Sequence, residues 1–241
     1  MKKIKQLRLL WQQIPAVMVT DILTNTDKFH GVVLDIEHGA FSAETMYACL
    51  ALGLAKGKQM FARFAYLDRH MIRVALDAGA TGIILSTVNT AEEANAFRSF
   101  CYYPEHSGFR GQGLVRENQW GKLPLVPQRK PVLVMQIETR QAVESLVGLV
   151  ALNFDYYMLG PYDLSSSLGI TGDFENLLYK RYWISFMGGV PKAKQAVHFV
   201  QRLPKDSWIP KDYGMVACSV DTLAIGDNVT HWEGELEADL R

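Results

Sequence analysis

Residues 131–138 read PVLVMQIE and residues 31–37 read GVVLDIE, two runs that are apolar nearly throughout and end on a carboxylate. Such runs are typical of parallel strands, because crossover helices cover both faces of a parallel sheet. Other short runs of apolar and β-branched residues recur along the chain. We therefore expect eight strands, at residues 16–19, 31–37, 59–64, 82–86, 131–138, 156–160, 196–200 and 214–221.

Helical patterns separate these runs. Apolar residues recur at three-to-four spacing in four intervening segments, residues 42–56, 68–78, 90–100 and 139–150. Ser42, Asp68 and Thr90 stand at positions suited to N-caps. Eight strand–helix alternations in 241 residues, without a linker or repeat, predict a single α/β domain over residues 1–241. The favoured architecture is a closed (β/α)8 TIM barrel, and the alternative is an open doubly wound sheet.

Some parts of the chain fit a barrel less well. The chain before Asp35 is short for a first strand and helix, and the piece after Asp221 is short for a last barrel helix. Residues 177–189, LLYKRYWISFMGG, have an unusual aromatic content for a barrel helix. Residues 107–130 form a long connection, which we expect to be functional because long structureless loops are otherwise uncommon.

The charge balance indicates a small-molecule partner. The chain has 25 Lys and Arg against 25 Asp and Glu, so its long-range field is weak and favours neither nucleic acid nor an anionic membrane. We find no signal-peptide pattern and no apolar stretch of transmembrane length, and we expect a cytoplasmic protein. Cys49, Cys101 and Cys218 are odd in number and far apart, which indicates buried thiols rather than disulfides.

Polar side chains close several of the expected strands. In a (β/α)8 barrel the catalytic groups lie at the C-terminal ends of the strands. The residues at these ends combine carboxylates, a histidine, an arginine and an amide: Glu37, His38, Arg63, Gln136, Glu138 and Asp163. No lysine stands among them, which argues against Schiff-base chemistry. Of the remaining histidines, only His198, in the expected seventh strand, is placed to line the same opening.

Five candidate residues allow two interpretations. Glu138 and Asp163 could hold Mg²⁺ or Mn²⁺ between neighbouring strands, or could cap the helices that follow. Arg63 could stabilise an enolate oxygen, or could pair with a barrel carboxylate. His38 could transfer a proton, or could be an ordinary hydrogen-bonding histidine. Asp77, in LDAGA at a helix end, could orient His38 or cap its own helix.

Seven runs in order along the chain resemble the HpcH/HpaI aldolases. They are LDIEHG (34–39), ARF (62–64), LDAGATGIILSTVNTAEEA (76–94), YYPEHSGFRGQG (102–113), VMQIETRQAVE (134–144), LGPYDLSSSLG (159–169) and ACSVDT (217–222). This family includes 4-hydroxy-2-oxoheptanedioate aldolase and 2-dehydro-3-deoxyglucarate aldolase. The resemblance implies a (β/α)8 barrel and a class II aldolase that uses Mg²⁺, Mn²⁺ or Co²⁺.

The resemblance also implies roles for individual residues. Glu138 and Asp163 would ligate the metal. Gln136, Arg63 and the backbone amides of Tyr162 and Asp163 would contact pyruvate. The expected reaction is cleavage of a 4-hydroxy-2-oxo acid to pyruvate and an aldehyde through a metal-stabilised pyruvate enolate. The alternatives are an oxaloacetate-type decarboxylase on the same site and a barrel that binds a keto acid without turnover.

The proton-transfer step and the assembly are implied in the same way. His38, paired with Asp77, would serve the acid/base step, with metal-bound water as a further proton carrier. Residues 115–122 occupy the place where relatives recognise the aldehyde, and their charge pattern leaves the identity of the substrate open. Relatives are homo-oligomers, hexamers that exchange the last helix between subunits, and the brief C-terminus sets this chain apart from them.

Overall fold

The computed structural model describes residues 6–124, 130–200 and 211–239. Its centre is a closed barrel of eight parallel strands in chain order, in which the last strand pairs with the first. The strands are β1 (Leu7–Gln12), β2 (Gly31–Asp35), β3 (Gln59–Phe64), β4 (Gly82–Leu85), β5 (Val132–Ile137), β6 (Tyr156–Leu159), β7 (Gln195–Phe199) and β8 (Met215–Cys218). The predicted (β/α)8 barrel is therefore confirmed, and the open sheet is excluded.

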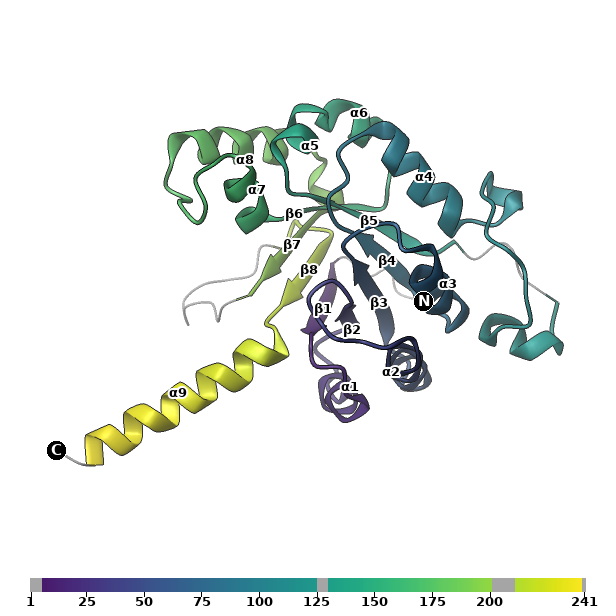
Figure 1. The fold of residues 1–241 in the computed structure, drawn as a ribbon, viewed down its shortest axis with the longest axis horizontal. Coiled ribbons are helices and arrows are strands. Elements are labelled where there is room, and N and C mark those ends of the chain that lie inside the picture. Colours follow the sequence, from purple (N-terminus) through teal and green to yellow (C-terminus); the bar gives the residue numbers. More distant parts are fainter. Residues whose placement is uncertain (1–5, 125–129, 201–210, 240–241) are drawn as a thin grey trace.

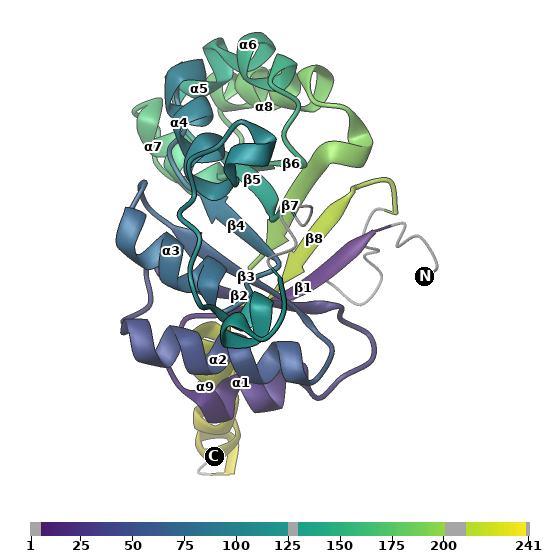
Figure 2. The ribbon, with the colours of Figure 1, turned by 90° about the vertical axis from the view of Figure 1, so that its right-hand side faces the viewer.

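Most of the helices lie around this barrel, as Figures 1 and 2 show. They are α1 (Val17–Thr24), α2 (Ala43–Ala55), α3 (Arg69–Asp77), α4 (Ala91–Cys101), α5 (Arg140–Glu144), α6 (Leu146–Ala151), α7 (Pro161–Ser167), α8 (Leu177–Gly189) and α9 (Asp221–Asp239), with 3₁₀ turns η1 (Pro104–His106), η2 (Arg116–Gly121) and η3 (Lys192–Lys194). The predicted N-caps Ser42, Asp68 and Thr90 each accept a hydrogen bond from the first turn of α2, α3 or α4.

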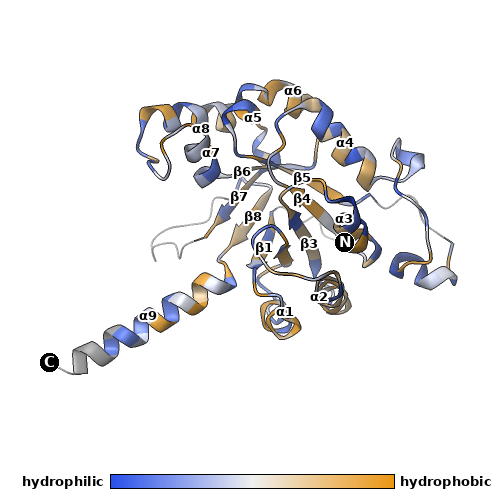
Figure 3. Ribbon diagram, viewed as in Figure 1, coloured by the Kyte–Doolittle hydropathy of each residue, from blue (hydrophilic) through white to orange (hydrophobic). Residues whose placement is uncertain are grey.

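Both faces of the strands are buried, as the continuous apolar runs predicted. In β2, Val33 packs inside the barrel with Phe61 and Met158, whereas Val32 and Leu34 belong to the layer between sheet and helices. Figure 3 shows the apolar colouring of the strands at the centre. Successive side chains of a strand point to opposite faces, and these are the two layers here. Asp35 lies two residues after Val33 and therefore points into the barrel as well.

The first strand was predicted at the wrong place. Residues 16–19 begin α1, and β1 lies earlier, at Leu7–Gln12, so the first strand–helix unit is complete. Leu7, Leu9 and Trp11 fill the barrel interior, which favours this earlier segment. The β-branched content of residues 16–19 is overridden because burial and pairing, rather than intrinsic propensity, select the strand.

The last helix was wrongly predicted to be short. α9 has 19 residues and projects away from the barrel in both views (Figures 1 and 2). Its first residue anchors it, since the Asp221 carboxylate accepts hydrogen bonds from the backbone N–H groups of Gln13, Ile14 and Thr222. Leu223, in the first turn, still packs against the barrel interior, and the helix then extends away from the barrel (Figure 1).

The two ends of the barrel differ in what they carry. Because the helices run antiparallel to the strands, every segment that follows a strand lies at one end, here called the mouth. Every segment that follows a helix lies at the other end, here called the base. Catalytic groups of (β/α)8 enzymes lie at the mouth.

The structure also tests the predictions about the cysteines and about membrane-spanning segments. Cys49 and Cys101 are buried free thiols, and Cys218 is a partly buried one. Over the residues that the structure describes, no helix combines the length and the apolarity that crossing a membrane requires.

Candidate active site

A cavity of about 760 Å³ opens at the mouth. Its lining falls into two sectors. The ends of β2, β3 and β5 contribute polar side chains, including Asp35, Arg63 and Gln136, whereas segments after β6, β7 and β8 contribute mainly apolar ones. His38 and Asp163 also line the cavity. The structure therefore brings most of the predicted site residues to one opening.

Arg63 is held by two carboxylates at the floor of the polar sector. Its Nε and Nη2 atoms donate to Asp35 Oδ1 and Oδ2 at 3.0 and 2.8 Å, and Nη1 lies 2.5 Å from Glu37 Oε2. Asp35 also accepts from Trp11 Nε1 at 3.0 Å and from Gln13 Nε2 at 3.1 Å. The ion-pair interpretation of Arg63 thus holds, and it does not exclude a catalytic role.

The ionised state of Asp35 is favoured by these partners. Burial acts to raise the pKa of Asp35, but the hydrogen bonds and charge of Arg63 outweigh it, with help from Trp11 and Gln13, and the pKa lies below its usual value. A carboxyl group whose pKa is lower in the folded chain than in the unfolded chain stabilises the fold. This stabilisation is complete at every pH above the pKa of the unfolded chain. That stabilisation is lost as the pH falls through the lowered pKa.

We expect Asp35→Asn to lower the free energy of unfolding by about 3 kcal/mol at pH 7, because Arg63 loses Asp35, the fully buried one of its two carboxylate partners. The pKa of Asp35 in the unfolded chain is 3.8. Below this pH, the difference in the free energy of unfolding between the variant and the unsubstituted protein should become smaller. Urea denaturation between pH 3 and 8 in EDTA measures this, with Asp27→Asn, at an exposed position, as the control. A difference that stays constant down to pH 3 would contradict the proposed pairing.

Glu138 is a buried carboxylate in which one oxygen accepts hydrogen bonds and the other accepts none from the described residues. Its side chain is 3% exposed. The backbone N–H and the hydroxyl of Thr87 both donate to Oε1, at 2.7 and 2.6 Å. Thr87 achieves this with φ of 53°, a left-handed and strained conformation that a β-branched residue rarely adopts. Oε2 faces Gly160, where a Cβ atom would lie only 2.8 Å away.

In the polar sector, carboxylates outnumber the positively charged side chains. Burial raises the pKa of Glu138, the hydrogen bonds from Thr87 oppose this rise, and repulsion from Asp163 and Glu37 adds to it. Asp35 and Glu37 pair with the Arg63 guanidinium, and no cation is paired with Glu138 or Asp163 among the described residues. Among the described residues that line the cavity, Arg63 is the only arginine or lysine. A divalent cation near Glu138 and Asp163 would relieve this repulsion, so the residues present fit a hard metal ion.

The protein supplies only part of such a coordination sphere. No group of three or more His, Cys, Asp or Glu side chains within the described residues is arranged to hold a metal. Mg²⁺ is commonly bound through one or two carboxylates, with water and substrate oxygens completing the shell. A site of two carboxylates is therefore consistent with a metal that also binds substrate.

Further polar groups lie near Glu138 and Asp163. The Ser86 hydroxyl lies between Glu37 Oε2, at 2.7 Å, and Gln136 Oε1, at 3.2 Å, which holds the Gln136 amide at the cavity wall. Tyr162 and Asp163 occupy the first turn of α7 and line the cavity. First-turn N–H groups have no carbonyl partner within their own helix, so these two can bind an anionic ligand.

His38 and Asp77 are not brought together within the chain. His38 is exposed at the cavity rim, and its backbone N–H donates to Asp35 Oδ1. Asp77 ends α3 at the base, where its Oδ1 accepts from Arg110 Nη2 at 3.0 Å. The predicted pairing is absent from this chain because a helix ends at the base, whereas β2 ends at the mouth.

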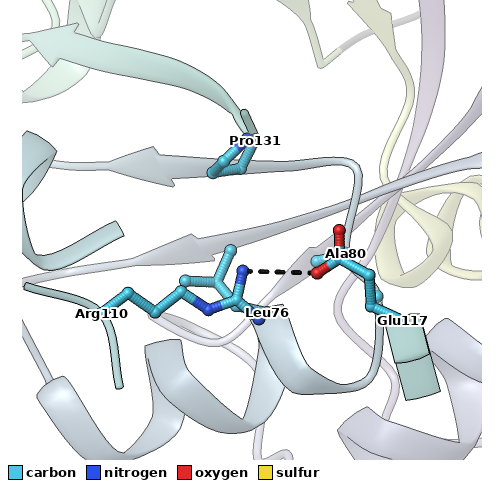
Figure 4. Close-up of a pocket in the computed structure, with 6 residues that line it drawn as sticks. Leu76, Ala80, Arg110, Glu117 and Pro131 are labelled. Atoms are coloured by element: carbon cyan, nitrogen blue, oxygen red, sulfur yellow. Dashed lines mark ion pairs between the residues drawn. The ribbon is translucent and has the colours of Figure 1, made fainter. Parts of the chain in front are cut away.

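Residues 107–124, the described part of the long connection before β5, also lie at the base. Figure 4 shows Arg110 ion-paired with Glu117 beside Leu76 and Ala80. Arg110 is 4% exposed. Arg110 also lies over the ring of Tyr103, at 4.5 Å. Of the connection, residues 125–129 fall outside the described residues. Residues 115–122 thus pack on α2 and α3 and do not line the cavity of their own chain.

His198 lines the cavity, as its strand position predicted. Its ring stacks on Trp11 with centroids 4.2 Å apart, and Nε2 lies 3.0 Å from the carbonyl oxygen of Ser219. A carbonyl only accepts, so Nε2 carries the proton and Nδ1 is an acceptor. Burial lowers the pKa of His198 to about 4, with the charge of Arg63 adding to this effect, so the ring is neutral at pH 7.

Four residues of the site were missed from sequence: Trp11, Asp35, Thr87 and Gly160. The signal for Asp35 was the strand period, which places it on the same inward face as Val33. Trp11 was hidden by the wrong position of the first strand. The backbone of Thr87 and the close approach of Gly160 to Glu138 have no local sequence signal, because they depend on neighbouring strands.

Comparison with known proteins assigns the chain to a family. The family model described as HpcH/HpaI aldolase/citrate lyase matches residues 15–197. The chain belongs to this family. The resemblance seen in its motifs is therefore confirmed.

Curated relatives and solved structures agree with this assignment. The 4-hydroxy-4-methyl-2-oxoglutarate aldolase of Hapsidospora irregularis is 29% identical over 168 residues, which cover 63% of this chain and 59% of that protein. The hydroxypyruvate/pyruvate aldolase of Chromohalobacter salexigens is 30% identical over 169 residues, 68% of this chain and 66% of that protein. The chain thus matches only about three fifths to two thirds of these relatives' length.

The fold agrees over nearly the whole chain. The crystal structure of an HpcH/HpaI aldolase/citrate lyase family protein from Burkholderia cenocepacia superimposes with a TM-score of 0.85 at 19% identity. The match covers 98% of this chain and 96% of that one.

Proposed function

We propose that this chain is a class II aldolase that cleaves 4-hydroxy-2-oxo acids to pyruvate and an aldehyde. The observation that carries the proposal is the environment of the buried Glu138. Thr87 donates to one of its oxygens, the other oxygen is available to a metal ion, and the nearby carboxylates Asp163 and Glu37 repel it. Family membership and the names of the aldolase relatives support the same reaction class.

Glu138 and Asp163 would hold the divalent ion, Mg²⁺ or Mn²⁺, with Co²⁺ as a further candidate. When bound, such an ion supplies a Lewis acid that polarises the keto group and offsets the negative charge of the substrate. Thr87 orients Glu138 for this role by fixing Oε1, which keeps the carboxylate from rotating.

Arg63 would bind the keto oxygen. A guanidinium has five N–H donors. Asp35 takes two of them and Glu37 takes one, so two remain for a substrate oxygen. The same carboxylates hold the side chain in one orientation, which lets it stabilise a developing oxyanion without reorganisation. Gln136 and the amides of Tyr162 and Asp163 would bind the carboxylate of the pyruvate half.

Cleavage moves one proton away from the substrate and returns one. The 4-hydroxyl group loses its proton, the C3–C4 bond breaks, C4 leaves as the aldehyde carbonyl, and the bonding pair forms the enolate of pyruvate. A proton then adds to C3 and gives pyruvate. His38 at the cavity rim is the side chain we assign to this transfer, without help from Asp77 of the same chain.

We further propose that the chain forms homo-oligomers and works in the cytoplasm. Ile225, Val229 and Trp232 lie at helical spacing on the projecting part of α9 and are 56%, 52% and 61% exposed. An apolar stripe on a helix without a partner in its own barrel supports association with another subunit. A monomeric mass by light scattering at assay concentrations would contradict this. The buried free thiols support a reducing compartment.

The test of the reaction is pyruvate release from 4-hydroxy-2-oxo acids of several chain lengths, coupled to lactate dehydrogenase. We expect release with Mg²⁺ or Mn²⁺ and loss of at least 90% of it in EDTA, because without the ion only Arg63 would polarise the keto group. Oxaloacetate belongs in the panel, since decarboxylation requires only the pyruvate half of the site. Release from oxaloacetate alone would favour a decarboxylase, and no release from any substrate would favour a barrel without turnover.

A further inference from the structure

The cavity has an apolar side that the proposed chemistry does not use. It is formed by Phe174, Tyr179, Phe199, Val200, Val220 and Leu223, here called the apolar wall. Phe199 ends β7, and the other residues come from the segments after β6, β7 and β8. They face a volume of about 760 Å³, far more than pyruvate fills.

The aromatic part of the wall is built to be rigid. The rings of Tyr162 and Phe174 meet edge to face with centroids 5.0 Å apart, and those of Phe174 and Tyr179 with centroids 5.2 Å apart. Tyr179, in the aromatic segment 177–189, is only 7% exposed. Edge-to-face packing of this kind fixes ring orientation. The unusual composition of this segment therefore serves the cavity, at least through Tyr179.

The described residues on this side of the cavity carry no positive charge. Among the described lining residues there is no lysine, and Arg63 is engaged by Asp35 and Glu37. His198, next to the wall, is neutral and offers an acceptor at Nδ1, for which the described residues provide no hydrogen-bond partner. An acceptor of this kind repels a carboxylate and accepts from a hydroxyl group.

We propose that the apolar wall holds the part of the substrate that leaves as the aldehyde, and that this part is an uncharged alkyl or aryl group. The inference rests on the proposed aldolase function. A carboxylate placed against this wall would lose its hydration without gaining a partner, which is costly. An aryl or alkyl group would gain from burial, and an aryl group also from edge-to-face contact with Phe174.

The test compares two substrates that differ only at the far end. 4-Hydroxy-2-oxoheptanoate releases butanal, and 4-hydroxy-2-oxoheptanedioate releases the same four-carbon aldehyde with a terminal carboxylate. We expect kcat/KM to be at least about tenfold higher for the monoacid. 4-Hydroxy-2-oxo-4-phenylbutanoate, which releases benzaldehyde, should also exceed the diacid.

A second readout isolates the pyruvate half. Exchange of the C3 protons of pyruvate in D2O with Mg²⁺, followed by NMR, requires enolisation but no aldehyde. Phe174→Arg places a cation on the wall and should lower the monoacid-to-diacid preference at least about tenfold while pyruvate exchange persists. Leu177→Arg, with the same charge change at a side chain that is 83% exposed outside the cavity, should alter neither.

The outcomes separate this inference from the function on which it rests. Pyruvate exchange together with an equal or higher kcat/KM for the diacid overturns the inference alone. Absence of both exchange and cleavage overturns the proposed function and the inference with it. If Phe174→Arg fails to fold, the comparison of monoacid and diacid in the unsubstituted protein still decides.

Discussion

Glu138→Gln is expected to lower pyruvate release at least about a thousandfold, a loss of roughly 4 kcal/mol of transition-state stabilisation. The amide keeps the size of the side chain and can still accept from Thr87 through its oxygen. It cannot offer an anionic oxygen in place of Oε2, which faces Gly160. Binding of Mn²⁺, measured by isothermal titration calorimetry, should weaken in parallel.

Stability separates loss of a ligand from loss of the fold. The raised pKa of Glu138 means that burial, and then Asp163 and Glu37, disfavour its ionised form at neutral pH. In EDTA at pH 7 to 8, Glu138→Gln should therefore leave the free energy of unfolding unchanged or raise it. Glu92→Gln, at an exposed position on α4, is the matched control and should change none of these quantities. Unchanged metal affinity and activity in Glu138→Gln would overturn the site assignment.

Gly160→Ala is expected to lower activity about a hundredfold by moving the same carboxylate. A Cβ atom at this position would lie 2.7 Å from Glu138 Cβ, 2.8 Å from its Oε2 and 3.0 Å from Gln136 Nε2. The backbone of Gly160, with φ of −98°, is open to alanine, so the effect comes from crowding of these two side chains. A shift of a catalytic group by about 1 Å can cost a factor of 100 in rate.

The control for this substitution is Gly148→Ala on α6, where an added methyl group meets no atom within 4 Å. It should keep full activity and gain about 0.5–1 kcal/mol of stability, because alanine favours a helix interior over glycine. Overpacking at Gly160 should cost about 1–3 kcal/mol of stability. Steady-state pyruvate release and urea denaturation measure both variants. Full activity in Gly160→Ala would mean that Glu138 is not confined as described.

Local pattern predicted the strands well where both of their faces are buried. PVLVMQI and GVVLD are apolar on both faces, and they are β5 and β2. The same reasoning failed at residues 16–19, whose apolar composition suits a strand but which begin a partly exposed helix. The alternating LRLLWQ segment is β1 instead. Short apolar runs do not reveal by themselves whether a partner strand is available.

Strand ends were better guides to the site than helix ends. Arg63, Gln136, His38 and Asp163 line one cavity because all parallel strands end at the same face of the barrel. Asp77 belongs to a run of the family motif but ends a helix, and it lies at the base with Arg110. Position relative to the nearest strand therefore decides which end of the barrel a residue occupies.

The amino-acid sequence by itself determined the parallel barrel, the polar residues at the mouth and the family. These depend on periodicity, burial and motifs that are local in the chain. Only the tertiary structure decided that Asp35 and Glu37 hold Arg63, that Thr87 fixes Glu138, that the apolar wall faces them, and that α9 leaves its barrel. These contacts join residues of different strands and loops, and barrel closure, rather than local pattern, sets the distances between them.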